Sequence, residues 1–476
     1  MEQVKYLLNH ENISLTAIDD SIKVTNPATK EILAYVKKTD EASLADIIQN
    51  ANLAFKSWSS ALASFRSDIL MKWYELVMQN RANLARLMTL EQGKSFNEAS
   101  GEIAYAASFI KWFAAQALRN DGDILTSVKK DEKLLVIKQP IGVCAAITPW
   151  NFPSAMITRK AAPALGAGCS MIVKPASQTP LSAYALASLA YTAGIPKDLF
   201  VIVSGDADMM STAFANSKII RKISFTGSTE VGIKIYEKSA KTIKKLSLEL
   251  GGNAPFIVFN DANLDKAVDG VMASKFRNSG QTCVCANRIY AQSGIYDEFC
   301  AKLNIAIKSL KLGNGLENGV NQGPLIDENA LKKVEEHIND ALKKGAKCLS
   351  GGKRSSLGGT FFEPTLLSGA TKDMLVAREE TFGPLCPVFK FQSDEEAIEV
   401  ANDTDFGLAS YIFTNDPKRQ WNMSESLEYG MVGVNTGLIS NEVAPFGGVK
   451  FSGLGREGSR YGMDEYTEQK YICLNL

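Results

Sequence analysis

The chain has 476 residues, which is too long for a single hydrophobic core and predicts two to four domains. Hydrophobic residues make up 45% and charged residues 22%, values typical of a globular protein. Lys plus Arg and Asp plus Glu both number 52, so no charge excess favours nucleic acid or an anionic membrane as a partner. No bilayer-spanning apolar run and no secretory signal are visible, and eight cysteines are too few for a disulfide framework. We expect a cytoplasmic protein with reduced thiols.

Two series of elements follow each other along the chain. Apolar positions three and four apart predict helices between residues 43 and 118, among them 69–78 and 84–90. Short apolar runs then alternate with helical stretches, at 141–147, 171–173, 200–203, 222–225 and 256–259. A second series between 288 and 434 has helices expected at 296–309, 328–344 and 395–401. Near-continuous apolar strands between helices are typical of parallel strands covered on both faces, so the prediction is an α/β protein with two doubly wound domains.

Two short strand-like stretches, 127–136 and 471–474, fit neither domain. Exposed strands readily pair with another chain. We interpret these stretches as an oligomerisation arm, and surface loops are the alternative interpretation.

The stretch 276–288 carries the candidate nucleophile. Cys283 follows a Gly-Gln-Thr turn, and such residues before a thiol favour a loop that holds the sulfur toward a pocket. A thiol nucleophile needs a proton acceptor. His10 lies in the N-terminal segment and His337 in a charged helical pattern, so neither is a good candidate. Glu249 ends an apolar run, where a carboxylate is costly without a function, and is the candidate base. A buried structural cysteine is the alternative for Cys283.

Three other turns suggest nucleotide and oxyanion binding. In 222–232 a strand leads into Gly227 and Ser228, which permit a sharp turn and cap a helix whose free N–H groups attract phosphate. Lys174 ends another strand, at the sheet edge where nucleotides bind. Asn151 follows a third strand, and its amide is a candidate donor to a developing oxyanion. Taken singly, these are also compatible with a common strand–turn–helix, a surface lysine and an ordinary turn.

Two further patterns have the spacing of a known binding motif but lack the features that the motif requires. The stretch 453–458 has G-x-G-x-x-G spacing, but it follows no clear apolar strand and no complete βαβ unit can come after it. Asp261, Asn263 and Asp265 have the spacing of a calcium loop, without the glycine and glutamate that such a loop needs. We therefore expect no metal site.

Seven motifs resemble the aldehyde dehydrogenase superfamily and occur in that family's order over essentially the whole chain. They are P-W-N-F-P, V-K-P-A, F-T-G-S-T, L-E-L-G-G, G-Q-T-C, E-E-T-F-G-P and P-F-G-G. The resemblance implies a dinucleotide-binding domain of residues 1–120 and 139–249, a catalytic domain of 250–440, and an oligomerisation arm of 121–138 and 459–476. It also implies NADP or NAD as cofactor, an aldehyde as substrate, and a homodimer or homotetramer.

The same resemblance implies roles for individual residues. Cys283 is similar to the family's nucleophile and Glu249 to its base, while Asn151 and the Cys283 backbone N–H form the oxyanion site. The residues expected around the cofactor are Trp150, Lys174, Ser177, Gly227, Ser228, Glu380 and Phe382. Phe446 is expected on the substrate side of the pocket.

The stretches M-I-T-R-K, R-N-S-G-Q-T-C-V-C-A-N and S-G-L-G-R-E-G-S-R-Y-G resemble the succinate-semialdehyde dehydrogenase branch. In that branch two arginines and a serine hold the substrate's distal carboxylate, and they match Arg159, Arg277 and Ser440, which we expect to converge near the pocket mouth. The expected reaction is oxidation of succinate semialdehyde to succinate through a cysteine thiohemiacetal and thioester. Alternatives are another ω-carboxylate aldehyde such as glutarate semialdehyde, a non-catalytic cofactor-binding protein and a thiol esterase.

Two neighbours of these motifs add expectations. Ser177 stands where many NAD-preferring relatives carry a glutamate that repels a 2′-phosphate, so we expect NADP to be preferred or well used. Cys285 lies two residues after Cys283 and is a candidate partner for a reversible disulfide, although many such pairs are too strained to form one.

Overall fold

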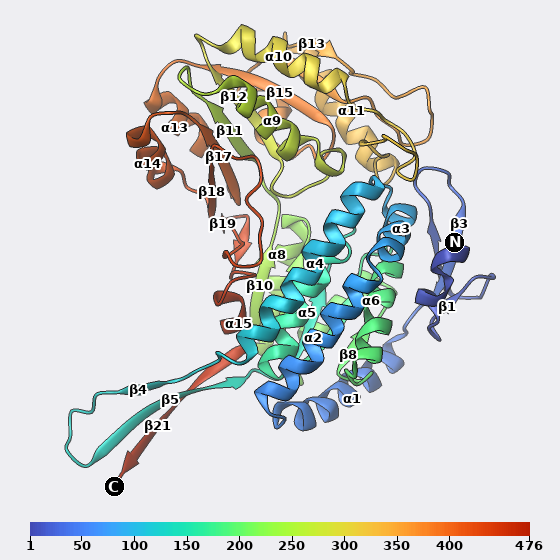
Figure 1. Ribbon diagram of the computed structural model, residues 1–476, viewed down its shortest axis with the longest axis vertical. Helices are drawn as coiled ribbons and strands as arrows, with labels where there is room; N and C mark the ends of the chain where they lie inside the picture. Colours follow the sequence, from blue (N-terminus) through green and yellow to red (C-terminus); the bar gives the residue numbers. More distant parts are fainter.

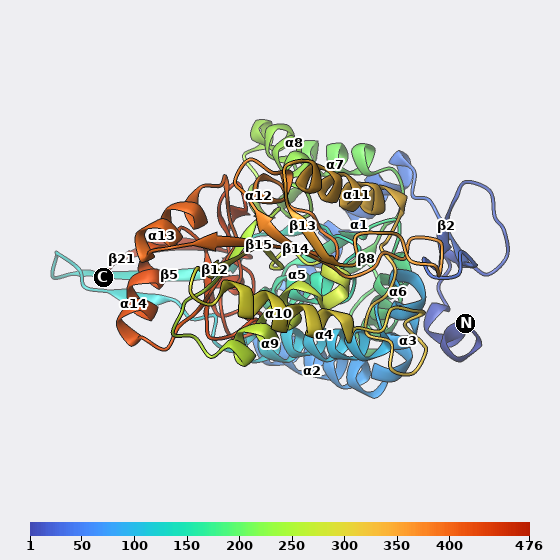
Figure 2. The same cartoon turned by 90° about the horizontal axis from the view of Figure 1, so that it is seen from above.

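The computed structural model describes residues 1–476 and shows two α/β lobes with a projecting β arm (Figures 1 and 2). The first lobe contains a six-stranded sheet and the second a seven-stranded sheet, and all but one strand of each sheet run parallel. The predicted architecture of two doubly wound α/β domains and a small β arm is confirmed. None of the helices combines the length and the apolar character needed to cross a membrane.

The sheet of the first lobe has the strand order β20-β10-β9-β6-β7-β8, with β20 antiparallel to β10. Its strands are β6 (Val143–Ile147), β7 (Ser170–Lys174), β8 (Phe200–Ile202), β9 (Ile220–Thr226), β10 (Lys245–Glu249) and β20 (Gly453–Leu454). The first four lie within two residues of the predicted strands. The strand β10 is additional, and it ends at the candidate base Glu249.

Helices cover both faces of this sheet because successive strand residues point to opposite sides. Val143 and Ala145 of β6 belong to one core cluster, and Cys144 and Ala146 to another. The helices are α1 (Glu41–Ser59), α2 (Ala63–Gln79), α3 (Arg81–Gln92), α4 (Phe96–Ala117), α5 (Ala155–Ala167), α6 (Pro180–Ala193), α7 (Ala207–Asn216) and α8 (Thr229–Ser239). The predicted helices 69–78 and 84–90 lie inside α2 and α3.

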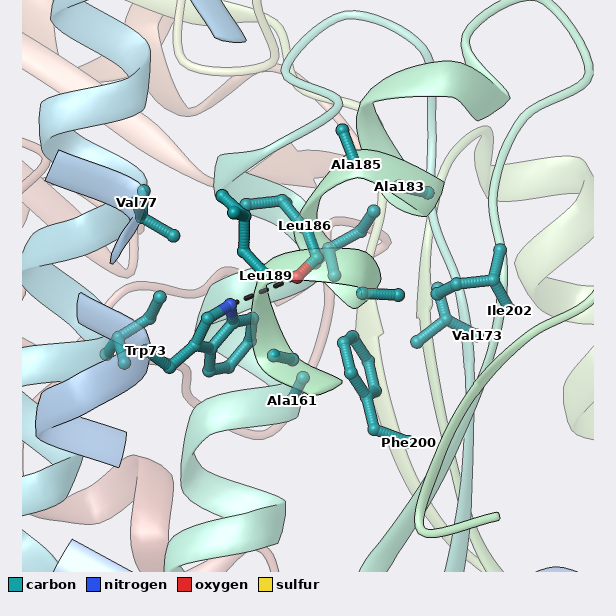
Figure 3. Packing of buried hydrophobic residues seen from close by; sticks show 14 of the residues in the cluster. Trp73, Val77, Ala161, Val173, Ala183, Ala185, Leu186, Leu189, Phe200 and Ile202 are labelled. Carbon is teal, nitrogen blue, oxygen red and sulfur yellow. Dashed lines mark hydrogen bonds between the residues drawn. The ribbon is translucent and has the colours of Figure 1, made fainter. Parts of the chain in front are cut away.

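Trp73 anchors the larger of these two clusters (Figure 3). Its indole N–H donates a hydrogen bond to the Leu186 carbonyl of α6 over 3.1 Å, and its ring lies 5.5 Å from that of Phe200 on β8. The buried indole therefore packs as an apolar group and still satisfies its one donor. A small antiparallel sheet that was not predicted precedes this lobe, with the elements η1 (Glu2–Leu8), β1 (Ile13–Ser14), β2 (Ser21–Thr25) and β3 (Ile32–Lys37).

The sheet of the second lobe has the order β13-β14-β15-β12-β11-β17-β18. Its strands are β11 (Ala254–Val258), β12 (Ala286–Gln292), β13 (Lys347–Ser350), β14 (Thr365–Ala370), β15 (Leu385–Phe391), β17 (Ala409–Phe413) and β18 (Met431–Val434). Its helices are α9 (Leu264–Lys275), α10 (Tyr296–Lys308), α11 (Glu328–Lys343), α12 (Leu375–Arg378), α13 (Asp394–Asn402) and α14 (Pro417–Ser426). The predicted strand 256–259 and the three predicted helices are confirmed as β11, α10, α11 and α13.

The remaining short elements connect the lobes and the arm. They are η2 (Ala240–Thr242), η3 (Arg277–Gly280), the paired strands β16 (Phe406–Gly407) and β19 (Val449–Lys450), and α15 (Tyr461–Asp464).

The arm is a three-stranded antiparallel sheet of β4 (Asp123–Leu125), β5 (Glu132–Pro140) and β21 (Thr467–Asn475). It projects away from both lobes in Figure 1. The expected strand 127–136 is wrong in its first half, because residues 126–131 form the connection between β4 and β5. Charged residues at 129–131 favour such a solvent-exposed turn.

A close approach between two strands explains the first glycine of the stretch 453–458. Gly453 pairs with Glu249 at the edge of the first sheet and has φ of 133°. A Cβ added there would lie 1.8 Å from the Leu248 carbonyl oxygen, so no other residue fits. The G-x-G-x-x-G spacing here thus belongs to a strand that docks beside β10.

Candidate active site

Cys283 lies in the loop between α9 and β12, and the backbone before it is tightly constrained. Asn278 and Ser279 both have left-handed φ values, of 52° and 54°. Gly280 has φ of 74°, and a Cβ there would lie 2.1 Å from the Gly383 carbonyl oxygen. Residues in such backbone conformations persist only where the surrounding structure holds them. These surroundings therefore fix the position of the loop and of the thiol that it carries. Burial raises the pKa of Cys283 to about 12, so the resting site holds a thiol that must lose its proton to react.

Cys283 opens onto a cavity of about 230 Å³ whose walls come from both lobes. Seven residues expected in the active site line it together: Trp150, Asn151, Gly227, Ser228, Cys283, Glu380 and Phe382. The rings of Trp150 and Phe382 meet edge to face, with centroids 5.6 Å apart. Enclosure raises the pKa of the half-buried Glu380 to about 7. The structure therefore brings residues more than 200 positions apart in the sequence around one thiol.

The N-terminus of α8 also lies at this cavity. Ser228 is the N-cap residue, and its hydroxyl oxygen accepts a hydrogen bond from the Val231 N–H. Uncapped N–H groups at such a helix start suit a phosphate. Lys174 and Ser177 are not among the residues that line this cavity. Lys174 is buried at the end of β7, where its amine donates to the Pro175 carbonyl and burial lowers its pKa.

Hydrogen bonds hold Asn151 through both its side-chain amide and its backbone carbonyl. Its side-chain amide donates to the Gln281 carbonyl over 3.1 Å, in the nucleophile loop. Its backbone carbonyl accepts from the Lys94 amine at 2.8 Å and from the Asn278 amide at 3.0 Å. An amide nitrogen has two hydrogens, so one hydrogen of Asn151 is left for an oxyanion.

Residues at the start of α4 support the loop that carries Asn151 and the loop that carries Cys283. The sequence interpretation missed this support. Lys94 is fully buried and pairs with Glu102, which accepts a hydrogen bond from the Ser154 N–H at 2.9 Å. Glu98 accepts from the Asn278 N–H at 2.7 Å. The available signal was a lysine followed by acidic residues four and eight positions later, at the start of an otherwise apolar helix.

Glu249 is buried at the end of β10, and neither of its carboxylate oxygens has a hydrogen-bond partner. Burial, with repulsion from Glu457 as the second cause, raises the pKa of Glu249 well above its usual range. Glu249 is not among the residues that line the cavity, yet it is close enough to contribute to the raised pKa of Cys283. A carboxylate with a raised pKa is a stronger proton acceptor, as a general base requires.

Arg159 lies deeper than the sequence suggested. It is 1% exposed, and its Nε lies 2.7 Å from Glu457 Oε2, without hydrogen-bond alignment. Its guanidinium lies 4.0 Å above the ring of the buried Phe446, and its Nη2 has no hydrogen-bond partner. Glu457 also pairs with Lys160. Burial opposes ionisation of Glu457, but Lys160 and Arg159 outweigh it and lower the pKa of Glu457. Two adjacent basic residues in an otherwise apolar helix were a sequence signal that a counter-ion is needed, although they do not identify it as Glu457.

Arg277 and Ser440 line a second cavity of about 310 Å³, called here the Arg277 cavity. Its other walls are Lys94, Glu98, Gly101, Glu102, Tyr105, Phe152 and Asn278. Arg277 lies 4.9 Å from the Phe152 ring and forms no ion pair with a carboxylate of the chain. Arg159 and Arg277 both act to lower the pKa of Cys283, against the larger effect of burial. Glu380 and Glu249 act in the opposite direction, so two arginines and two carboxylates together influence the thiol.

Cys285 is not among the residues that line either cavity. It is buried, and its thiol donates to the Lys275 carbonyl over 3.5 Å. All eight cysteines of the chain are free thiols in the structure. The reversible disulfide between Cys283 and Cys285 stays a prediction.

A loop thiol and a buried carboxylate thus lie near one cavity between two α/β lobes. The model of the aldehyde dehydrogenase family matches residues 15–472. The chain therefore belongs to the aldehyde dehydrogenase family.

Several relatives are similar over nearly their whole length. A glutarate-semialdehyde dehydrogenase of Pseudomonas aeruginosa is 59% identical over 95% of this chain and 94% of its own length. A succinate-semialdehyde dehydrogenase of Escherichia coli, named for NADP(+), is 57% identical over 96% of this chain and 95% of its own. The crystal structure of succinate-semialdehyde dehydrogenase from Burkholderia pseudomallei superposes with a TM-score of 0.97 at 55% identity and covers 99% of both chains.

Proposed function

We propose that the protein oxidises succinate semialdehyde to succinate with NADP or NAD. The observation that carries this substrate is the Arg277 cavity, where an arginine without a carboxylate partner and Ser440 line one space, with Arg277 close enough to Cys283 to act on its pKa. A guanidinium binds a carboxylate bidentately, and a buried carboxylate without a partner would be prohibitive. Glutarate semialdehyde is the second candidate, because the Pseudomonas aeruginosa relative is named for it.

The residues of the site account for the proton transfers. Glu249 accepts the proton of Cys283, and the thiolate attacks the aldehyde carbon to form a thiohemiacetal. The negative oxygen of this intermediate meets the free hydrogen of the Asn151 amide and the Cys283 backbone N–H. The bound nicotinamide dinucleotide supplies the hydride acceptor. After Glu249 has released this first proton to solvent, it takes a proton from water. The resulting hydroxide adds to the thioester carbon and the carbon–sulfur bond breaks, and Glu249 returns its proton to the departing thiolate as the acid is released. The alternative of a non-catalytic protein is disfavoured because the chain retains Cys283, Glu249 and Asn151.

The cofactor fits the walls of the first cavity. The start of α8 with Ser228 suits the pyrophosphate, and Glu380 suits a ribose hydroxyl as an acceptor. Trp150 and Phe382 would bound the nicotinamide. Lys174 and Ser177 would hold the adenosine end, away from the thiol.

The substrate proposal is tested by Arg277→Ala. One charge-assisted hydrogen bond contributes about 1.5–3 kcal/mol, so kcat/KM for succinate semialdehyde should fall by about one to two decades. With uncharged butanal, which has no carboxylate to bind, kcat/KM of the variant should fall little. Arg221→Ala, at an exposed arginine on β9, is the matched control. Equal losses on both aldehydes would make Arg277 structural and remove the support for an ω-carboxylate substrate.

Cofactor preference is tested at Ser177. A neutral residue there opposes no 2′-phosphate, so kcat/KM should be at least as high with NADP as with NAD. Ser177→Glu should lower kcat/KM for NADP more than for NAD, in initial-rate assays at saturating aldehyde. A wild-type enzyme that clearly favours NAD would show that Ser177 is not the determinant.

A further inference from the structure

One wall of the Arg277 cavity is a single face of α4. Glu98, Gly101, Glu102 and Tyr105 line the cavity, and their spacing of three and four residues places them on one side of a helix. The Tyr105 hydroxyl is buried without a hydrogen-bond partner, as expected of a wall that contacts a polar ligand. Gly101 stands in the middle of this face, so the carbon chain of a substrate would pass beside it.

Gly101 has no structural reason to be glycine. At Gly166, Gly232 and Gly270, the other glycines inside the long helices, an added Cβ would lie 3.2, 2.4 and 2.5 Å from a neighbouring atom. At Gly101 an added Cβ would meet nothing within 4 Å, and no left-handed backbone is required there. Alanine would fit and would favour the helix. Gly101 is exposed, and the open space beside it includes the cavity that it lines.

We propose that Gly101 is a specificity-determining residue whose missing side chain leaves room for the carbon chain of an ω-carboxylate aldehyde. The inference rests on the proposed function. In a bound aldehyde the reacting carbon would be fixed at Cys283 and the carboxylate at Arg277, so every additional methylene needs extra room near Arg277, in the cavity that Gly101 also lines. A side chain at position 101 would take up that space and would exclude longer aldehydes more strongly than shorter ones.

The test compares Gly101→Ala and Gly101→Leu with the wild type on succinate semialdehyde, glutarate semialdehyde, propanal and hexanal. One methylene in a pocket is worth about 10-fold to 200-fold in kcat/KM. Gly101→Leu should therefore lower the ratio of kcat/KM for glutarate semialdehyde over succinate semialdehyde by about tenfold, and Gly101→Ala by less. The kcat/KM value for propanal should change by less than about twofold. Both variants should melt at or above the wild-type temperature, because a better helix former replaces glycine. Ala115→Leu adds the same kind of bulk on an exposed part of α4 and should change neither ratio nor melting temperature.

Two results would overturn the proposal. One is an unchanged glutarate-to-succinate ratio, and the other is an equal loss on all four aldehydes with a changed oligomeric state in light scattering. A wild-type enzyme without preference for carboxylate aldehydes would instead contradict the proposed function. In that case the hexanal-to-propanal ratio of Gly101→Leu still reports on the cavity, so the two failures are distinguishable.

Discussion

Cys283 is enclosed so that its thiol keeps its proton in the resting site. Burial raises the pKa of the Cys283 thiol to about 12 and the pKa of the Glu249 carboxyl well above its usual range. A protonated thiol limits unwanted reaction before substrate is bound, because the thiolate is the reactive form. Below a thiol's pKa, its thiolate fraction rises about tenfold for each pH unit. The free enzyme should consequently be alkylated slowly at neutral pH.

The first prediction separates the two neighbouring cysteines. Cys283→Ala should lower the dehydrogenase rate by more than about a hundredfold, because loss of a nucleophile removes the covalent route. Cys285→Ala should keep most of the rate, since its thiol contacts only backbone carbonyls in the core. The predicted disulfide adds a second measurement. Inactivation by peroxide that dithiothreitol reverses in the wild type, and that Cys285→Ala lacks, would support it; equal sensitivity of both proteins would contradict it.

For individual residues, the sequence predicted the side chains that take part in the reaction better than the residues that position them. The turn before Cys283 and the carboxylate after an apolar run are local signals, and both are legible without a structure. Lys94 contacts the Asn151 carbonyl 57 positions away, and Lys160 contacts Glu457 across 297 positions. No local pattern names such a partner. For the same reason Arg159 was expected near the pocket mouth, because its counter-ion Glu457 was not recognised.

At the scale of elements, α6 depends on a residue of α3. The helix begins at Pro180 without a side-chain cap of its own. Glu91 accepts hydrogen bonds from the Leu181 and Ser182 N–H groups, both at 2.8 Å. Burial raises the pKa of Glu91 to about 7, although these hydrogen bonds oppose the shift. The segment before this helix contains Ser177, so Glu91 also steadies the expected adenosine site.

This arrangement predicts a pH-dependent stability. With a folded-state pKa of about 7 against an unfolded value near 4.5, the folded protein holds the proton more tightly, so the contribution is full below pH 4.5 and is lost as pH rises to about 7. Glu91→Gln cannot titrate. The stability of the wild type relative to Glu91→Gln should therefore fall by up to about 3 kcal/mol between pH 4.5 and 7.5, measured as melting temperatures. Glu75→Gln, at an exposed glutamate of α2, is the control. A pH-independent difference would contradict the prediction.

The elements themselves were predicted well where apolar runs are continuous. The parallel strands of both lobes are buried on two faces, which leaves a clear signal in β6 and β7. The strand β10 was missed because its first residues are lysine, leucine and serine of mixed polarity. The N-terminal sheet was missed as well, since its strands are short and only partly buried.

For the whole molecule, we propose that the arm joins subunits into a dimer or tetramer. It exposes apolar side chains that a single chain does not cover, with Ile124 83% and Val128 95% exposed. Burying a large apolar side chain contributes about 1.5–3 kcal/mol. The double substitution Ile124→Lys and Val128→Lys should therefore weaken association by orders of magnitude, seen as a smaller mass in light scattering. Trp421→Lys removes an exposed apolar residue from α14 and should leave the mass unchanged. An unaltered assembly in the double variant would place the interface elsewhere.

The late position of β20 has a consequence for how the protein is made. Glu249 ends β10, yet the strand that covers this edge of the first sheet begins at Gly453. About 200 residues, including nearly all of the second lobe, are synthesised in between, which at roughly 5–20 residues per second takes about 10–40 s. The interval between synthesis of the strand β5 and of its partner β21 is longer still. During that time a nascent chain exposes unpaired strand edges at its future catalytic base and at its arm, so the ribosome-bound chain should need protection from aggregation until the second lobe has emerged.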